Sequence, residues 1–419
     1  MAYPKVYRIE QNFDSSHISD IPGRVHREIS RLDLQGRLKP GDTVAVTAGS
    51  RGIANIAMIV KSVVTELQTL GARPFIVPAM GSHGGATIEG QQSVLERFGI
   101  TETSMGVPIR ATMETIQLGT TSQGIPVFVD RFAFAADHIA VVNRIKPHTD
   151  FSGEIESGLT KMMAIGLGKR QGATHYHRAN IQYGYYTVIT SVASVVLQQC
   201  KILFALGIVE NAYEQTAIIE GMRPSEIAIQ ERQLLRQAKS FLARIPFDFG
   251  DILIVDEMGK NISGTGIDTN VVGRTVSQRE RPPAKPSFTR IVVRDLSPDT
   301  YGNATGIGLA DVVTRKLVDK IDFSPTYINA VTSTNIEGSR IPLTCATDQE
   351  AVETAISTSG VSSPQACRLV WIKNTLKLNQ LIASEAYLDE IQEKNHLRIL
   401  EPLGELAFTA NGDLAGRFQ

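Results

Sequence analysis

Two consecutive strand-loop-helix cycles constrain the fold of this chain more than any other feature. The first cycle has an apolar strand at 43–46 and an amphipathic helix from about 54 to 70. The second has a strand at 74–78, a glycine-rich loop at 80–87 and a helix from about 88 to 98. Neighbouring parallel strands need crossover connections of this length. The pattern therefore predicts an α/β fold with a parallel sheet covered by helices.

A length of 419 residues is more than one ordinary hydrophobic core organises. A long charged and apolar helix at 223–243 ends just before Pro246, and a new apolar strand begins at residue 251. We therefore expect two α/β domains, an N-terminal one at 1–246 and a C-terminal one at 247–419.

The second domain shows its own alternation of elements. Strands are expected at 251–255, 290–294 and 368–372, and helices at about 309–321 and 348–357. The proline-rich and charged run at 277–287 is typical of an exposed loop. These elements indicate a second α/β layer.

Composition excludes several classes of partner. The net charge is -1, with 42 basic and 43 acidic residues, so no positive field favours nucleic acid or an anionic membrane. The first residues lack the basic-then-apolar run of a signal peptide, and the three cysteines are scattered, which favours the cytoplasm. The longest apolar region, 185–209, is interrupted by polar residues and predicts a buried helix followed by a strand. A small-molecule ligand is the expected partner.

Two histidines each follow the end of a predicted strand. His83 lies in a Gly-Ser-His-Gly-Gly loop, and His148 follows Pro147. Either could be a turn histidine without function. Loops at the carboxyl ends of parallel strands line the ligand crevice of open α/β sheets, so the two side chains are expected to converge there. Two imidazoles on either side of a substrate could exchange protons near neutral pH.

The stretch 143–177 concentrates further titratable groups. Lys161 precedes Met162 and Met163, whose apolar side chains could desolvate the amine as a nucleophilic lysine requires, although a surface lysine is the ordinary alternative. His175 and His177 do not share a helix face, and no nearby acidic or histidine cluster completes a hydrolytic zinc site. Only one of the two would point at a site.

Anion-binding candidates lie at two loops. Arg51, with Ser50, begins a helix and could hold a carboxylate or phosphate, or be a surface arginine. The glycines at 259, 264 and 266 do not match the dinucleotide-binding pattern.

The order of these residues resembles the lactate racemase family that depends on a nickel-pincer nucleotide. The resemblance covers at least residues 40 to 180. The family shows an arginine loop, a glycine-rich histidine loop, Pro-His, Phe-Ser-Gly, Gly-x-x-Lys and a final histidine. The corresponding residues here are Ser50-Arg51, Gly81-Ser82-His83, Pro147-His148, Phe151-Ser152-Gly153, Gly158-Leu159-Thr160-Lys161 and His177.

The resemblance implies a racemase or epimerase that inverts C2 of a 2-hydroxy acid by proton-coupled hydride transfer, with the active site in the cleft between two α/β domains. It implies that Lys161 carries the nucleotide covalently and that His177 is the protein ligand of its nickel. His83 and His148 would be the acid/base pair. The implied cofactor contacts are Lys161, Ser50, Arg51 and Gly84, and the implied substrate contacts are Arg51 and Lys260. Cofactor-synthesis proteins would load the chain.

Three departures from the lactate pattern concern the substrate. The family's aspartate three residues before the arginine is replaced by Ala48, and Glu154 and Glu156 lie in an extended stretch before Lys161. The family's Gln-x-x-Lys substrate contact has no clear match, so Lys260 is assigned by position alone. We therefore expect a larger or more polar hydroxy acid than lactate, such as a dicarboxylate or sugar acid. The alternatives are a non-catalytic or cofactor-handling binding protein of the same fold, and a lyase or hydrolase with an ordinary divalent metal.

Overall fold

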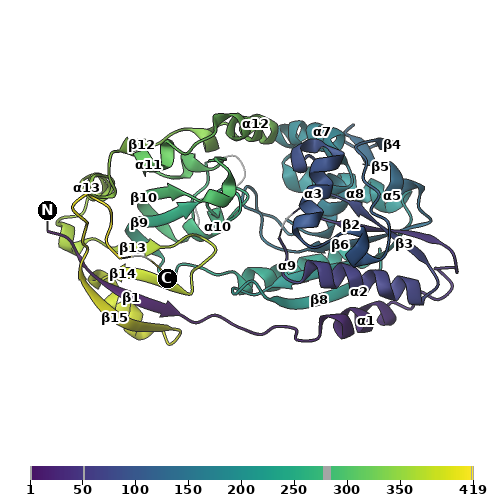
Figure 1. Cartoon of the computed structure of the whole chain (residues 1–419), viewed down its shortest axis with the longest axis horizontal. Helices are drawn as coiled ribbons and strands as arrows, with labels where there is room; N and C mark the ends of the chain where they lie inside the picture. The colour runs from purple at the N-terminus through teal and green to yellow at the C-terminus, as the bar shows by residue number, and fades with distance from the viewer. Residues whose placement is uncertain (1, 51, 277–284, 417, 419) are drawn as a thin grey trace. The chain divides into compact units, whose positions relative to one another are not determined.

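The computed structural model describes residues 2–50, 52–276, 285–416 and 418 (Figure 1). The chain divides into two compact units, one of residues 14–242 and one that combines Met1–Phe13 with Ala243–Gln419. Each unit contains one large β-sheet with helices packed on it. The chain therefore has the expected α/β fold.

The unit of residues 14–242 is built on a five-stranded sheet with the strand order β3-β2-β6-β7-β8. The first four strands in this order run parallel, and β8 pairs antiparallel with β7. The two predicted strand-loop-helix cycles form β2-α2 and β3-α3. The bounds are β2 (Thr43–Ala48), α2 (Ile56–Thr69), β3 (Arg73–Pro78), α3 (Ile88–Arg97), β6 (His138–Arg144), β7 (Ile202–Glu210) and β8 (Thr216–Met222).

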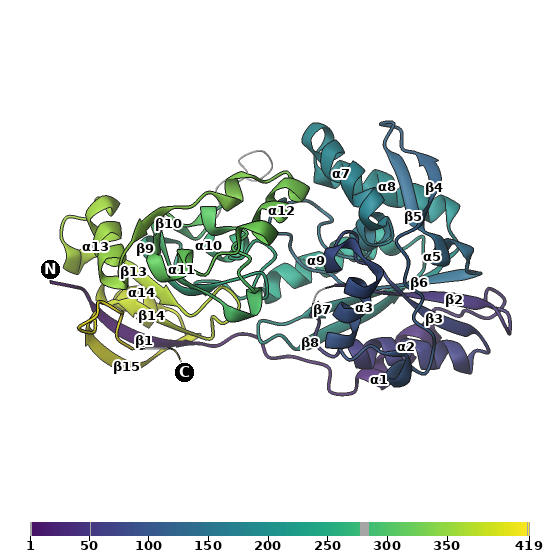
Figure 2. The ribbon, with the colours of Figure 1, turned by 45° about the horizontal axis from the view of Figure 1, so that its top comes forward.

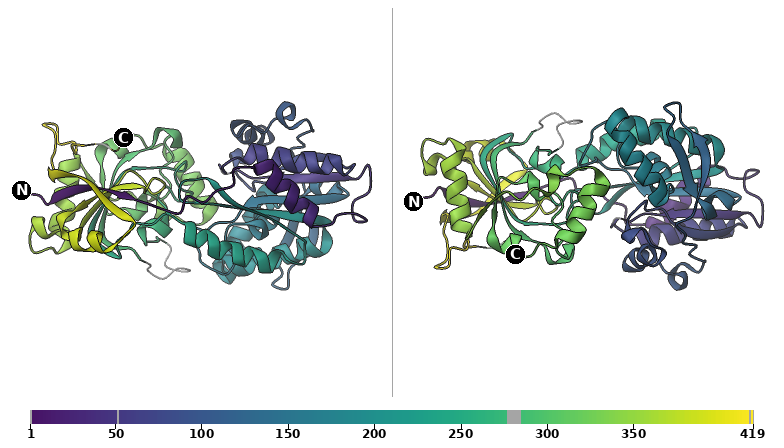
Figure 3. Two further views of the ribbon diagram at one scale, coloured as in Figure 1. Left: turned by 90° about the horizontal axis from the view of Figure 1, so that it is seen from below. Right: turned by 90° about the horizontal axis from the view of Figure 1, so that it is seen from above.

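Helices cover both faces of this sheet (Figure 3). Successive strand residues point to opposite faces, and in β2 the side chains of Val44 and Val46 join one core while Ala45 joins the other. The first core includes α1 (Ile21–Arg31) and α2, and the second includes α8 (Tyr185–Gln199) and α9 (Ile227–Phe241).

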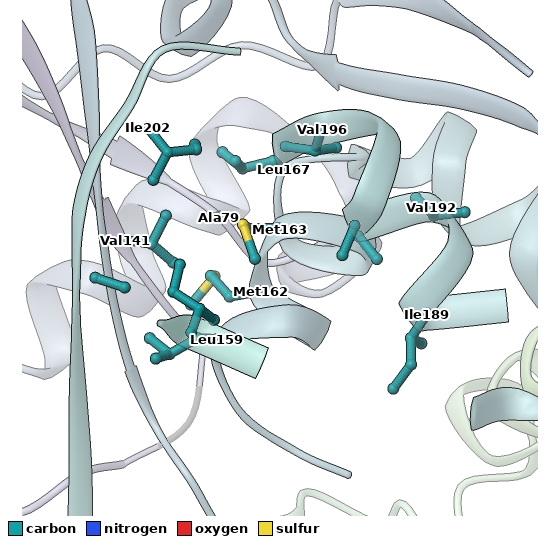
Figure 4. Close-up of a cluster of buried hydrophobic side chains, with 14 of the residues drawn as sticks. Ala79, Val141, Leu159, Met162, Met163, Leu167, Ile189, Val192, Val196 and Ile202 are labelled. Carbon is teal, nitrogen blue, oxygen red and sulfur yellow. The ribbon is translucent and has the colours of Figure 1, made fainter. Parts of the chain in front are cut away.

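The second core lies directly beneath the stretch that carries Lys161. Figure 4 shows it, with residues Met162, Met163, Leu167, Val141, Val192 and Val196. The remaining elements of this unit are α4 (Glu102–Met105), β4 (Thr115–Thr120), β5 (Pro126–Asp130), α5 (Arg131–Ala135), α6 (Leu159–Lys161) and α7 (Lys169–Tyr183), with β4 and β5 forming a separate hairpin.

The other unit is built on an eight-stranded sheet with the order β12-β11-β10-β9-β13-β14-β1-β15. The strands from β12 to β13 run parallel, and the remaining pairs are antiparallel. The strand bounds are β1 (Lys5–Gln11), β9 (Phe249–Met258), β10 (Ser287–Leu296), β11 (Val312–Thr314), β12 (Leu343–Cys345), β13 (Leu369–Ile372), β14 (Gln380–Ser384) and β15 (Leu397–Glu405).

The N-terminal residues differ from the expected domain of residues 1–246. Strand β1 pairs with β14 and β15 (Figure 2), so residues 1–13 belong with 243–419. Only Val6, Ile9 and Gln11 of β1 are buried, which is too little apolar periodicity to identify the strand from its sequence. The partner strands lie at the other end of the chain, so no local signal assigns β1 to them.

The expected helix at 309–321 is wrong over its first half. Residues Val312–Thr314 form the parallel strand β11 between β10 and β12, and only Arg315–Val318 is helical (α11). β-Branched residues in a fully buried run favour a strand. The predicted loop at 277–287 lies largely outside the described residues. The other helices of this unit are α10 (Thr269–Val272), α12 (Phe323–Ser333), α13 (Asp348–Ser359) and α14 (Leu388–Glu393).

None of the helices within the described ranges is both long and apolar enough to cross a membrane.

Candidate active site

The candidate site lies at the carboxyl edge of the parallel strands of residues 14–242. Strands β2, β3 and β6 end at Ala48, Pro78 and Arg144, and the loops that follow carry Ser50, His83 and His148. Parallel strands have their carboxyl ends at one edge of the sheet, as the sequence predicts. Arg51, the candidate anion-binding residue, lies outside the described residues.

His148 and Lys161 lie side by side. The Nζ atom of Lys161 is 2.5 Å from Nε2 of His148. The loop between them is closed at its base, because the backbone groups of Lys146 and Ser157 exchange two hydrogen bonds of 3.0 and 3.2 Å. The side chain of Asn143, near the end of β6, also donates to the Gly158 carbonyl at 2.8 Å. Both ends of the loop are thus fixed to the sheet.

The orientation of the His148 ring is set by its own backbone. The N–H of Asp150 donates to Nδ1 of His148 at 3.0 Å. This contact occupies Nδ1, so Nε2 is the ring nitrogen that faces Lys161. Phe151 packs on the same ring at a centroid distance of 4.4 Å and stacks on Tyr185 at 5.0 Å.

Glu156 is an internal support of this loop rather than a surface residue. Its side chain is 2% exposed. It accepts hydrogen bonds from the backbone N–H of His148 at 2.6 Å and of Gly153 at 3.1 Å, and from Nζ of Lys239 on α9 at 2.6 Å. A buried carboxylate needs such donors. The neighbouring Glu154 is 61% exposed and forms an ion pair with Arg232 at 3.2 Å.

His177 lies on α7, on the side of the helix that faces the same aromatic group. Its Nδ1 atom is 2.5 Å from the hydroxyl of Tyr185, and the two rings meet edge to face. Burial lowers the pKa of His177 to about 4, so the imidazole is neutral near pH 7. A neutral imidazole with one nitrogen engaged by a hydrogen bond is the usual form of a metal ligand.

His175 occupies the opposite side of α7. Its ring is exposed, and Nδ1 is 2.9 Å from the Gln171 carbonyl. Of the two histidines, only His177 is directed toward the residues around His148.

A π-helical turn at Met162–Gly166 follows Lys161 directly. Such turns are rare and occur frequently at functional sites. The carbonyl of Gly166, the last residue of the turn, accepts a hydrogen bond from Gly81 at 3.2 Å. This contact joins the Lys161 segment to the loop that carries His83.

His83 is exposed, and Ser50 forms a short hydrogen bond to its Nδ1 atom. The backbone of the His83 loop is held by hydrogen bonds from α3. The buried side chain of Gln91 on α3 donates to the carbonyls of Gly81 at 3.1 Å and His83 at 3.3 Å. His83 is thus a solvent-facing imidazole on a backbone with internal support.

Beneath Gln91 lies a buried ion pair. Lys169 is fully buried and its Nζ atom is 3.0 Å from Asp130, which is also fully buried. The same amine donates to Oε1 of Gln91 at 3.2 Å and to the Pro78 carbonyl. Burial lowers the pKa of Lys169, and Asp130 opposes this effect. Sequence reasoning missed Gln91, Lys169 and Asp130, because lysine and aspartate are ordinarily exposed.

Two further candidates have contacts of their own. Gly84 has a φ of +65°, and a Cβ there would lie 2.7 Å from the backbone of Gly90, so glycine is required for packing against α3. In the other unit Lys260 follows β9, and its Nζ atom donates to the Asn329 side chain at 2.8 Å.

A pocket of about 400 Å³ opens between the loop at 152–154 and α9. Its lining includes three cationic side chains and one carboxylate. The lining residues are Ser152, Gly153, Glu154, Arg232, Leu235, Arg236 and Lys239. Across the described ranges, no group of three or more histidine, cysteine, aspartate or glutamate side chains could hold a metal ion. A metal bound near His177 would need ligands that those ranges do not supply.

The fold and the site together define an α/β protein of two units, with a lysine and a histidine in contact at the carboxyl edge of one parallel sheet. Residues 24–185 match the family model described as the lactate racemase N-terminal domain. The structure is similar to that of the lactate racemase apoprotein from Thermoanaerobacterium thermosaccharolyticum, with a TM-score of 0.57 and 14% identity over 88% of this chain and 98% of that chain. No curated protein matches the sequence. The match of residues 24–185 and the shared fold confirm the resemblance to the lactate racemase family that the sequence predicts.

Proposed function

We propose that this chain is a racemase or epimerase that inverts C2 of a 2-hydroxy acid with a nickel-pincer nucleotide attached to Lys161. The observation that carries the proposal is the contact of Lys161 with His148, beside Tyr185, whose hydroxyl contacts His177. An amine, an acid/base imidazole and a neutral imidazole suited to a metal are the three groups that this chemistry requires.

The residues present fit such a cofactor. His177 offers one neutral imidazole whose other nitrogen contacts Tyr185, and the described residues supply no three-ligand cluster of their own. A nickel ion that arrives with sulfur and carbon donors needs only one such ligand. Lys161 would hold the nucleotide, and Ser50, Arg51 and Gly84 would contact it. When bound, this cofactor supplies a hydride acceptor for C2.

Proton transfer would fall to two histidines on separate loops. His148 presents Nε2 to the site, and its ring is fixed by Asp150 and Phe151. His83 lies on the loop after β3, with Ser50 on its Nδ1 atom. One imidazole would remove the hydroxyl proton of one enantiomer, and the other would serve the opposite enantiomer. Arg51 would bind the substrate carboxylate.

The substrate we propose is a dicarboxylic or sugar 2-hydroxy acid rather than lactate. Ala48, three residues before Arg51 in the sequence, stands where the lactate pattern has an aspartate, so this segment carries one negative charge fewer. Three cationic side chains line the pocket beside the loop that follows His148. Arg232 pairs with Glu154 and Lys239 with Glu156, so Arg236 supplies the excess positive charge. More positive charge favours a substrate with additional acidic or polar groups. Cofactor-synthesis proteins would load the chain in the cytoplasm.

The test uses protein produced together with the cofactor-synthesis proteins. Single enantiomers of a monocarboxylic, a dicarboxylic and a sugar 2-hydroxy acid are incubated with it, and chiral chromatography measures the opposite C2 configuration. We expect inversion of the dicarboxylic or sugar acid, and none with Lys161→Ala. Protein with a loaded Lys161 that inverts no acid would instead indicate a cofactor-handling protein, and inversion by unloaded protein with a divalent metal would remove the nickel assignment.

A further inference from the structure

Glu231 is a buried carboxylate to which the proposed mechanism gives no role. It lies on α9 and is 1% exposed. Its two oxygens lie 3.2 and 3.1 Å from the backbone nitrogen of Thr160, and one of them accepts from the Thr160 hydroxyl at 2.5 Å. Both hydrogen-bond donors of Thr160, its backbone N–H and its hydroxyl, are thus directed at one carboxylate. Thr160 immediately precedes Lys161.

The absence of a side chain at Gly158 leaves room for the Glu231 carboxylate to reach Thr160. A Cβ atom on Gly158 would lie 2.0 Å from Oε1 of Glu231, so any side chain there would displace the carboxylate. Burying a carboxylate is unfavourable unless donors compensate for the lost water. The glycine and the donors of Thr160 together make the position suitable for a side chain with an acceptor oxygen.

The same helix also supports His148. Lys239, on α9, donates to Glu156, and Glu156 accepts from the backbone N–H of His148. Helix α9 thus anchors the Lys161 segment through Glu231 and the His148 loop through Lys239. The two side chains that it supports are the ones that meet at 2.5 Å.

We propose that Glu231 is a positioning residue that holds the Lys161 amine against Nε2 of His148. Glu231 acts through Thr160, so its effect is on where Lys161 lies. The role that Lys161 then plays rests on the proposed function, but the positioning itself does not.

The experiment measures the reactivity of Lys161 in the protein without cofactor. A short pulse of acetic anhydride is applied, and peptide mass spectrometry gives the acetylation rate of Lys161 relative to exposed Lys201 in the same molecule. In Glu231→Ala the segment loses its anchor, and we expect Lys161 to react about fivefold faster while Lys201 is unchanged. Thr160→Val removes only the hydroxyl donor, so a smaller increase is expected.

Two variants control for general loosening. Glu231→Gln keeps one acceptor oxygen for Thr160 and is expected to restore most of the wild-type rate. Gln233→Ala changes an exposed residue of the same helix and is expected to leave the rate unchanged. An unchanged Lys161 rate in both Glu231→Ala and Thr160→Val would overturn the proposal, as would an equal rise at Lys201. Failure of the proposed function would show separately, as wild-type protein in which Lys161 never acquires the nucleotide.

Discussion

The Nζ atom of Lys161 lies 2.5 Å from Nε2 of His148. Lys161 is the residue that we propose to carry the cofactor, and His148 is one of the two proposed acid/base residues. Their contact depends on a loop that is closed at its base and supported by Glu156. The arrangement makes the tether and the proton-transfer group parts of one supported structure.

Loss of the Glu156 support is expected to weaken both the fold and the reaction. Glu156→Ala removes the acceptor for the His148 N–H and the partner of Lys239. We expect urea unfolding to show a loss of about 1–3 kcal/mol, because buried donors lose their acceptor, with a parallel loss of C2 inversion. Glu154→Ala is the matched control, since Glu154 is 61% exposed, and it should change stability by less than about 0.5 kcal/mol. Equal stability and activity in the two variants would contradict the role of Glu156.

The two proposed acid/base histidines are expected to be needed together. His83→Ala and His148→Ala should each reduce C2 inversion by roughly 10²–10⁴-fold, because each removes a proton-transfer group. Deuterium incorporation and chiral analysis of the product measure the effect. His175→Ala serves as the control, because this histidine is exposed on the other side of α7. Full activity in either of the first two variants would refute the pairing.

The buried ion pair beneath the His83 loop should respond differently to single and double substitution. Lys169→Met leaves Asp130 charged and buried without its cation, which is expected to cost about 3–5 kcal/mol in the free energy of unfolding. Asp130→Asn in the same molecule should recover part of that loss. Lys201→Met, at an exposed position, is the control. A stable Lys169→Met single variant would show that the pair does not support the loop.

Glu231 is expected to make stability depend on pH. Burial raises the pKa of Glu231 from 4.5 to about 7, so the folded chain binds this proton more tightly than the unfolded chain. The resulting stability is fully present below about pH 4.5 and is lost as the pH rises to about 7, by on the order of 3 kcal/mol. Unfolding free energies at several pH values, taken as the difference between wild type and Glu231→Gln, measure it. Taking this difference cancels the contributions of other groups to the pH dependence. One such group is His177, whose lowered pKa makes stability rise with pH instead of fall. A difference that is constant from pH 5 to 8 would contradict the burial effect.

The positions of His83 and His148 at the carboxyl edge of the first sheet could be predicted, because the sequence patterns that indicate them lie within short segments. Apolar strands followed by glycine-rich loops carry His83 and His148, and the structure ends β3 and β6 just before them. Strand β1 gave no such signal, since its partners lie near the other end of the chain.

The supports of the site could not be predicted for a related reason. Glu156, Glu231 and Lys169 are residue types that ordinarily lie on the surface. Each is buried here because donors or acceptors from distant segments meet it, as Lys239 meets Glu156 and Thr160 meets Glu231. Sequence periodicity indicates which positions face a core. It does not indicate which polar group of a distant segment will form a hydrogen bond or ion pair with a side chain at that position.

The state of Lys161 tests the central claim most directly. Protein produced with the cofactor-synthesis proteins is measured by intact-mass and peptide mass spectrometry, together with its metal content. We predict an adduct of nucleotide size on Lys161 with one nickel per chain, absent from Lys161→Ala. An unmodified Lys161 in protein that binds zinc instead would contradict the account.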